Sequence, residues 1–524
     1  MTLRAGRILL LATCVLAANA ASALAQTSPP RKVDSPRGHG HGPGAPAEAS
    51  SLGTENPWGK GARSGCPPGE GPLARAAGFA PGAGCPPGEG PGAVEAFAAQ
   101  ASAQPGLEPS APEGAPRAAR DGFGFDLRDG LTFTLADPSL RAHAGALLAV
   151  DHRTYDRRNQ RSAGAYLDRA LLRFDARLWE VIELRLQVDL RGIDTRTALD
   201  ESYVSVEAVP GLLRLSGGLL RIGVGTEHSF AEETLSFVDY ASPAVLTGRH
   251  DLGLALDGEA WEGLLSWYVA AGGGEGFDAW GHRRGDPVLA GRAVVYPFRW
   301  STAAAELGPY RLPLLSGFFV SVGGLATFGY EGHLDLGTSL RNRAFTVGRI
   351  EGDRSLFYHG GYGVDFGPLR FLHEFVRGSI FGVDLPLGGE ADFENKISSW
   401  SASLAWRVTG EPYDSRPFRQ RGRGSFPRRP LCDASPQSAG FGTLEVAVRY
   451  TNTEGDREFF DRGFTRYSIS SQEFRAFDVA LNWYPVRTLR LTFQLTRVIA
   501  DQEPAAFGGR GRDTSFLFRL QVDL

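Results

Sequence analysis

Arginine is the residue type with which this chain could do chemistry. The sequence holds 55 lysine and arginine residues, and only three of them, Lys32, Lys60 and Lys396, are lysines. A guanidinium group stays charged at every physiological pH and binds phosphate or carboxylate oxygens in a bidentate manner. A GC-rich genome produces the same surplus, so the composition fits either selection for guanidinium chemistry or a coding bias.

Many of these arginines alternate with apolar residues. From Ile182 to Arg191 every second residue is apolar, and similar alternation recurs at 172–178, 400–407, 444–451, 477–484, 489–496 and 516–524. Successive side chains of a strand point to opposite faces, and in a membrane barrel one face meets lipid while the other meets the lumen. The alternating stretches exceed the usual soluble strand of about five to six residues, and aromatic pairs such as Trp483-Tyr484 suit an interfacial girdle.

The pattern therefore predicts an all-β fold, a transmembrane antiparallel β-barrel of about 16 strands over residues 129–524. A soluble β-sandwich is the alternative. Pro210-Gly211, Gly308-Pro309 and Gly367-Pro368 are predicted as short turns.

Within the alternating stretches, arginines at the positions that would face the lumen are the candidate lining of an anion path. The alternative is that they form an interior mesh of ion pairs with acids of the same parity, which would stabilise the barrel without selecting a solute. The candidates are Arg173, Arg177, Arg185, Arg191, Arg249, Arg407, Arg449, Arg490 and Arg519; the acids are Asp175, Glu183, Asp189, Glu445, Asp478 and Asp523.

A second arginine-rich stretch falls between two predicted strands and is expected to be a long loop at the mouth. It could concentrate anions by electrostatic focusing, bind the phosphates of lipopolysaccharide, or remain solvated. Its members are Arg416, Arg419, Arg421, Arg423, Arg428 and Arg429.

The leading part of the chain is typical of export. Arg4 and Arg7, an apolar stretch and Ala23-Leu24-Ala25 predict a signal peptide over residues 1–25, with lipoprotein processing at Cys14 as the alternative. Residues 26–120, rich in proline, glycine and alanine, are predicted to be a disordered periplasmic segment. Whether Cys66 and Cys85 pair is left open. No later run of about 18 apolar residues offers a transmembrane helix, so we expect localisation in the outer membrane of a Gram-negative bacterium.

Other function classes receive little support. There is no cysteine–histidine cluster, no Gly-x-Ser-x-Gly and no His-Glu-x-x-His, so we expect neither an enzyme nor a metal or other cofactor. The net charge of -4 argues against nucleic acid as a partner.

Several collinear segments resemble the phosphate-selective porins, a family of phosphate and polyphosphate channels of the outer membrane. The Thr-Gly-Glu element within 408–413, followed by the strand up to Tyr450, is moderately specific. The other segments are 169–190, 199–204, 215–225 with Glu232-Glu233, 249–253 and 481–484.

This resemblance implies a homotrimer of sixteen-stranded barrels that passes small anionic solutes, with a third loop folded inward. The expected partners are outer-membrane lipids, lipopolysaccharide and the barrel-assembly machinery. The sequence departs from the family in two ways. Lysine is nearly absent, and the candidate constriction loop, 226–251, is rich in acids such as Glu227 and Asp239. A constriction lined by these acids, here called the acidic eyelet, would repel phosphate. A non-selective or cation-preferring porin and a structural anchor without transport are therefore alternatives.

Overall fold

The computed structural model describes residues 122–126, 130–134, 139–156, 163–192, 199–230, 234–273, 287–298, 317–337, 343–384, 390–391, 394–413 and 440–524. All of them belong to one compact unit, Pro105–Leu524. The predicted signal peptide and leading segment, with Cys66 and Cys85, lie outside the described residues.

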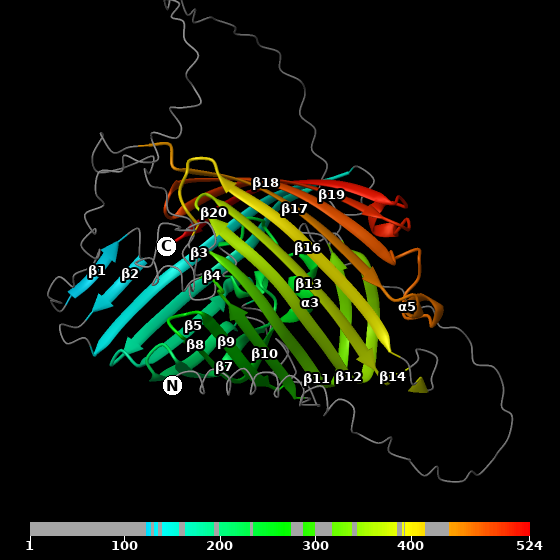
Figure 1. Ribbon diagram of the computed structural model, residues 1–524. Helices are drawn as coiled ribbons and strands as arrows, with labels where there is room; N and C mark the ends of the chain where they lie inside the picture. The colour runs from blue at the N-terminus through cyan, green and yellow to red at the C-terminus, as the bar shows by residue number, and fades with distance from the viewer. Residues whose placement is uncertain are drawn as a thin grey trace, which may run out of the picture. The chain divides into compact units, whose positions relative to one another are not determined.

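Sixteen antiparallel strands close into a barrel, as the alternation predicts (Figure 1). Each strand pairs with its neighbour in the chain, and β20 pairs with β3 to close the ring. The strands are β3 (Leu140–Tyr155), β4 (Gly164–Leu178), β5 (Ile182–Asp189), β6 (Leu199–Val209), β7 (Leu213–Gly223), β8 (Gly248–Ala260), β9 (Leu265–Gly272), β10 (Val288–Val295), β11 (Phe318–Gly337), β12 (Arg343–Phe366), β13 (Leu369–Phe381), β16 (Asn395–Arg407), β17 (Thr443–Gly455), β18 (Glu473–Val486), β19 (Leu489–Ala500) and β20 (Arg512–Asp523).

A hairpin of β1 (Gly122–Asp126) and β2 (Gly130–Thr134) precedes the barrel. β2 pairs with residues 141–144 of β3, while β20 pairs with residues 147–155 of β3. The last residue, Leu524, exchanges two backbone hydrogen bonds with Ala146, at 2.8 and 3.0 Å. The hairpin therefore occupies the part of β3 that β20 is too short to reach.

The outward face of the barrel is apolar. Leu252 and Leu254 of β8, Val322 of β11 and Leu495 of β19 are among many large apolar side chains that stay exposed, at positions two residues apart. Soluble monomers rarely expose apolar surface continuously around the molecule, so this face meets lipid. The inward face carries the polar positions of the same strands.

The two ends of the barrel differ in their connections. One end, here called the turn end, holds the C-terminus and the short turns 179–181, 210–212, 261–264, 367–368 and 487–488. The predictions at Pro210-Gly211 and Gly367-Pro368 are confirmed, whereas Gly308-Pro309 lies outside the described residues. At the opposite end, here called the loop end, every connection spans five residues or more, although two long connections, 296–317 and 408–442, lie at the turn end. Outer-membrane barrels place short turns in the periplasm and long loops outside.

Among the residues that the structure describes, helical structure is confined to short pieces in the connections. These are η1 (Leu190–Gly192), η2 (Glu227–Ser229), α3 (Ser242–Thr247), α5 (Glu458–Asp461) and η7 (Ala505–Phe507), and a two-residue pair, β14 (Val383–Asp384) with β15 (Glu390–Ala391), lies between β13 and β16. None of the helices among the described residues is both long and apolar enough to cross a membrane.

Candidate functional site

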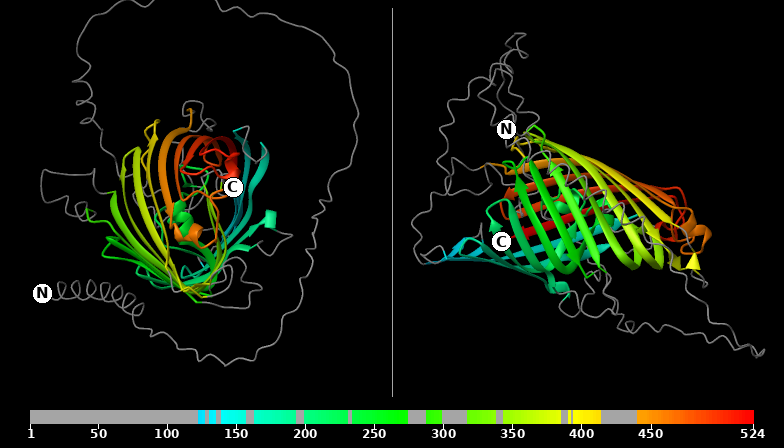
Figure 2. Two further views of the ribbon diagram at one scale, coloured as in Figure 1. Left: turned by 90° about the vertical axis from the view of Figure 1, so that its right-hand side faces the viewer. Right: turned by 60° about the horizontal axis from the view of Figure 1, so that its bottom comes forward.

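The connection between β7 and β8 folds into the barrel. This inward segment, residues 224–247, contains η2 and α3, and α3 contacts β8, β11, β12, β13 and β16. Figure 2 shows α3 within the ring of strands. The inward third loop implied by the family resemblance is therefore present.

Glu374 of β13 fixes the start of the inward segment. Its carboxylate accepts hydrogen bonds from the backbone nitrogens of Thr226 at 3.0 Å and Glu227 at 3.2 Å. These nitrogens open η2, where backbone donors have no partner inside the helix. His359 of β12 lies 3.3 Å from the same carboxylate.

The ring of His228 packs between two strand ends. Gly223 and Gly248 face each other across β7 and β8, and a Cβ atom added to either glycine would collide with this ring. Burial, then the positive charges of Arg221, His250 and Arg292, hold the pKa of His228 well below its ordinary value. The neutral ring accordingly accepts a hydrogen bond from Arg221 at 3.4 Å.

The backbone of Ser236–Asp239 is attached to four consecutive strands of the wall; we call this set of bonds the staple. Side chains of β17 to β20 each contribute one attachment, and backbone atoms of the segment are the partners. Asn482 donates to Ser236 O at 2.8 Å, Gln494 accepts from Val238 N at 2.9 Å, Arg519 donates to Val238 O at 3.4 Å, and Arg449 donates to Asp239 O at 3.1 and 3.2 Å.

Arg449 is the centre of the staple. It forms ion pairs with Asp478 at 3.1 Å and with Glu227 at 2.8 Å, and its guanidinium lies 4.2 Å from the ring centroid of Phe237. Its side chain is only 2% exposed. An unpaired charge so deeply buried would be costly, so the inward segment and the wall depend on each other.

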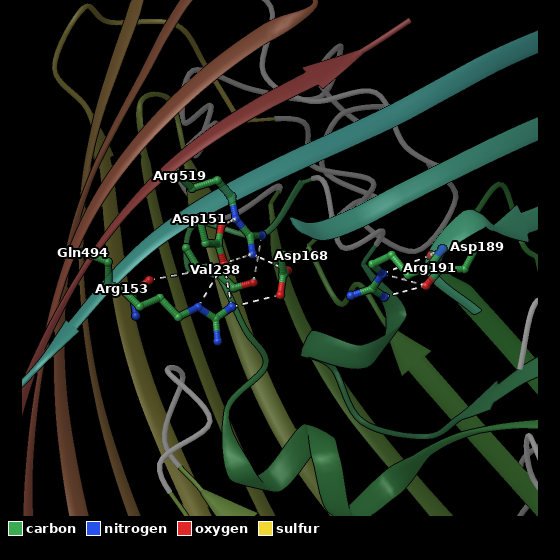
Figure 3. Close-up of polar contacts among 8 residues, drawn as sticks. All are labelled: Asp151, Arg153, Asp168, Asp189, Arg191, Val238, Gln494 and Arg519. Carbon is green, nitrogen blue, oxygen red and sulfur yellow. Dashed lines mark hydrogen bonds and ion pairs between the residues drawn. The ribbon is translucent and has the colours of Figure 1, made fainter. Parts of the chain in front are cut away.

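A second buried network joins the closing strands (Figure 3). Arg519 of β20 binds Asp151 of β3 at 2.6 Å and also contacts Asp168 of β4, while Arg153 binds both acids, at 2.5 and 2.9 Å. The two guanidiniums thus share two carboxylates across the seam of the barrel, next to Val238.

The wall formed by β4 to β8 is open to solvent by comparison. The side chains of Arg173, Arg185, Arg191 and Arg214 are 18–30% exposed, against 2–7% for Arg449 and Arg519. Each is nevertheless paired with an acid; the partners are Asp523 at 3.3 Å, Asp175 at 2.6 Å, Asp189 at 2.5 Å and Asp257 at 2.6 Å. This set of half-exposed ion pairs is called the open wall below.

The remaining candidate arginines also have partners. Arg407 lies 3.7 Å from Glu445, Arg490 donates to Asn482 at 2.8 Å, and the exposed Arg177 lies 3.4 Å from Glu207. The side chain of Arg249 lies outside the described residues. The geometry thus contains the interior mesh that the sequence left as an alternative, and the anion path stays a prediction.

Arg416, Arg419, Arg421, Arg423, Arg428 and Arg429 lie outside the described residues, but the ends of their connection are described. β16 ends and β17 begins at the turn end, together with the C-terminus. Under the usual orientation this end faces the periplasm, whereas lipopolysaccharide lies outside. The three interpretations of this stretch stay predictions.

The predicted acidic eyelet presents fewer free negative charges to the lumen than the number of its acidic residues indicates. Glu227 is paired with Arg449, and its Oε2 accepts a hydrogen bond from Ala241 N at 2.6 Å. Asp251 is fully buried in β8. Glu232 and Glu233 lie outside the described residues.

Sequence reasoning missed several participants. Arg153 and Arg214 were not among the candidate arginines, although Arg214 holds the lumen-facing parity, and neither Asn482 nor Gln494 was a candidate. Among the described residues, no group of three or more histidine, cysteine, aspartate or glutamate side chains could hold a metal ion.

No protein-family model matches the chain, and no curated protein matches it in sequence. Solved structures with a similar fold include the outer membrane channel DcaP of Acinetobacter baumannii (9% identity, TM-score 0.44, covering 74% of this chain and 98% of that one). Two others are an anion-selective porin from Comamonas acidovorans (8%, 0.41, 74% and 100%) and OprB of Pseudomonas putida (11%, 0.41, 74% and 94%). At such identities the likeness concerns the barrel architecture alone, and the phosphate-selective subtype remains a prediction.

Proposed function

We propose that this chain is an outer-membrane porin, a passive channel for small charged solutes that pass along the open wall. The observation that carries the proposal is the contrast in exposure between the two walls. The inward segment covers β17–β20, whereas the ion pairs of β4–β8 remain accessible to water. A homotrimer, export through a signal peptide and insertion by the barrel-assembly machinery belong to the same proposal.

The solutes are expected to include small anions such as phosphate, with weak selectivity. Half-exposed guanidiniums attract anions, but each has an acid within 3.3 Å, so the net field along the wall is small. A non-selective or cation-preferring channel is the second candidate, because further acids, Glu183 and Glu201, lie beside Arg214 and Arg185.

Planar-bilayer recording of the purified barrel tests both the channel function and the proposed preference for anions. We expect stepwise conductance and a small reversal potential in a KCl gradient, with its sign giving the preferred ion. Added phosphate should reduce chloride current if anions follow the open wall. Absence of conductance steps would reject the porin function and favour the structural anchor, while a strongly cation-selective reversal potential would reject the anion preference.

A further inference from the structure

Three arginines lie on the outward, lipid-facing surface of the barrel near its loop end. They are Arg475 of β18, Arg497 of β19 and Arg512 of β20, and all three are exposed. Their positions alternate with inward residues in the same register as the exposed Phe477, Leu495 and Phe516. Charged side chains are therefore placed where the strands otherwise present apolar groups to the membrane.

The strand register brings the three arginines together around Ile499. Arg475 lies directly opposite Ile499, and Ile499 lies directly opposite Arg512. Arg497 precedes Ile499 by two residues, which makes it a diagonal neighbour of both other arginines. Such neighbours are about 7–8 Å apart, within reach of long side chains. We call this set the outer arginine triangle.

Nearby acids balance only part of this charge. Glu473 binds Arg475 at 2.8 Å, and Glu454 lies opposite Glu473 on β17. Within the described part of the chain, Arg497 and Arg512 form no ion pair. A guanidinium is costly in hydrocarbon and is tolerated at the level of the lipid headgroups, so the triangle marks the headgroup level of the outer leaflet.

We propose that the outer arginine triangle binds the phosphate groups of an anionic glycolipid, lipopolysaccharide, in the outer leaflet. Guanidinium groups pair bidentately with phosphate, and three of them match a headgroup that carries several charges. Towards the turn end the same surface continues with Phe493 and Phe518, whose rings lie 4.9 Å apart and can contact acyl chains. This site is on the outer surface and is independent of any solute in the lumen.

The test measures binding of lipopolysaccharide to the full-length, delipidated barrel in detergent, by native mass spectrometry. The variant Arg475→Gln/Arg497→Gln/Arg512→Gln is compared with a control of equal charge change, Arg457→Gln/Arg462→Gln/Arg510→Gln. The control arginines lie in the loops at the same end and pair with Asp461, Glu458 and Asp156. Each basic residue near an anionic surface contributes roughly fivefold to binding, so we expect about hundredfold weaker binding for the triangle variant. The control should bind almost as tightly as the natural chain.

The proposal would be overturned if the triangle variant and the control variant bound lipopolysaccharide equally, whether tightly or weakly. It would also be overturned if the natural chain did not bind lipopolysaccharide. Lipid A without phosphates should bind the natural chain as weakly as intact lipid binds the triangle variant; tight binding would contradict phosphate recognition. Displacement of the lipid by millimolar inorganic phosphate would indicate a site for free anions instead. The heat-dependent shift in electrophoretic mobility shows whether each variant is folded. If the triple variant does not fold, the single variant Arg497→Gln replaces it in the binding measurement, and we expect it to bind about fivefold more weakly than the natural chain.

Discussion

The wall of β17–β20 and the open wall of β4–β8 present the same kinds of side chain to the lumen and use them differently. On the first wall, Arg449 and Asp478 are almost completely buried, because the inward segment lies against them. On the second wall, Arg185 and Asp175 form a shorter ion pair and yet keep 21% and 29% of their side-chain surface exposed. The two walls carry the same residue types, so contact with the inward segment decides whether a lumen-facing charge is buried in the structure or accessible to solutes.

The largest expected effect comes from breaking the centre of the staple. Arg449→Gln leaves Asp478 and Glu227 without their cation, and removal of one partner of a buried pair costs about 3–5 kcal/mol. Arg185→Gln on the open wall should cost less, about 1 kcal/mol, since water reaches this pair and replaces part of the lost interaction. Denaturant unfolding followed by tryptophan fluorescence measures both, and equal destabilisation would show that the two walls do not differ.

Asn482→Ala should have the next largest effect. Asn482 accepts hydrogen bonds from Arg490 and Thr492 and donates to Ser236 O, so its loss leaves several buried groups without a partner, at about 1–3 kcal/mol. Hydrogen exchange of the peptide that contains Ser236–Asp239 should become faster. Gln187→Ala on the open wall is the matched control, and faster exchange of that peptide in the control would contradict the assignment.

Acidification should loosen the inward segment through His228. Because the pKa of this ring is lowered in the folded state, a released segment takes up a proton below about pH 6.5 while the packed segment does not. The packed state is then favoured above that pH and loses up to about 1.4 kcal/mol per pH unit below it. Hydrogen exchange of the segment at pH 7.5 and 5.5 measures the effect. His228→Gln should make the dependence shallower, and an unchanged slope would exclude His228 as its source.

The smallest expected effect is on selectivity. Arg173→Gln/Arg185→Gln/Arg214→Gln should shift the cation-to-anion permeability ratio about two- to fivefold towards cations, and less at high salt, because exposed charges are screened. The outer arginine triangle variant carries the same charge change outside the lumen and should leave the reversal potential unchanged. A shift of similar size in both variants would show that the open wall does not line the path.

The alternation of residues was sufficient to predict the barrel and the parity of Arg449 and Arg519, and the Pro-Gly and Gly-Pro pairs predicted the turns at 210–212 and 367–368. Neither pattern could show which arginines the inward segment covers. The reason is that the acceptors in the staple are mostly backbone oxygens of Ser236–Asp239, and backbone atoms carry no signal in the sequence. The pairing of Arg519 with Asp151 likewise joins residues 368 positions apart, and periodicity says nothing about such distances.

The seam between β3 and β20 has a consequence for biosynthesis. The ring can close only when the final strand, β20, is available, since Leu524 itself bonds to Ala146. Until then the first and last strands present unpaired edges, which are templates for association with other chains. Pairings between such distant parts of a chain also form slowly. The chain must therefore be kept apart from its copies until β20 is available, so a chain that is truncated within β20 should aggregate instead of closing its barrel.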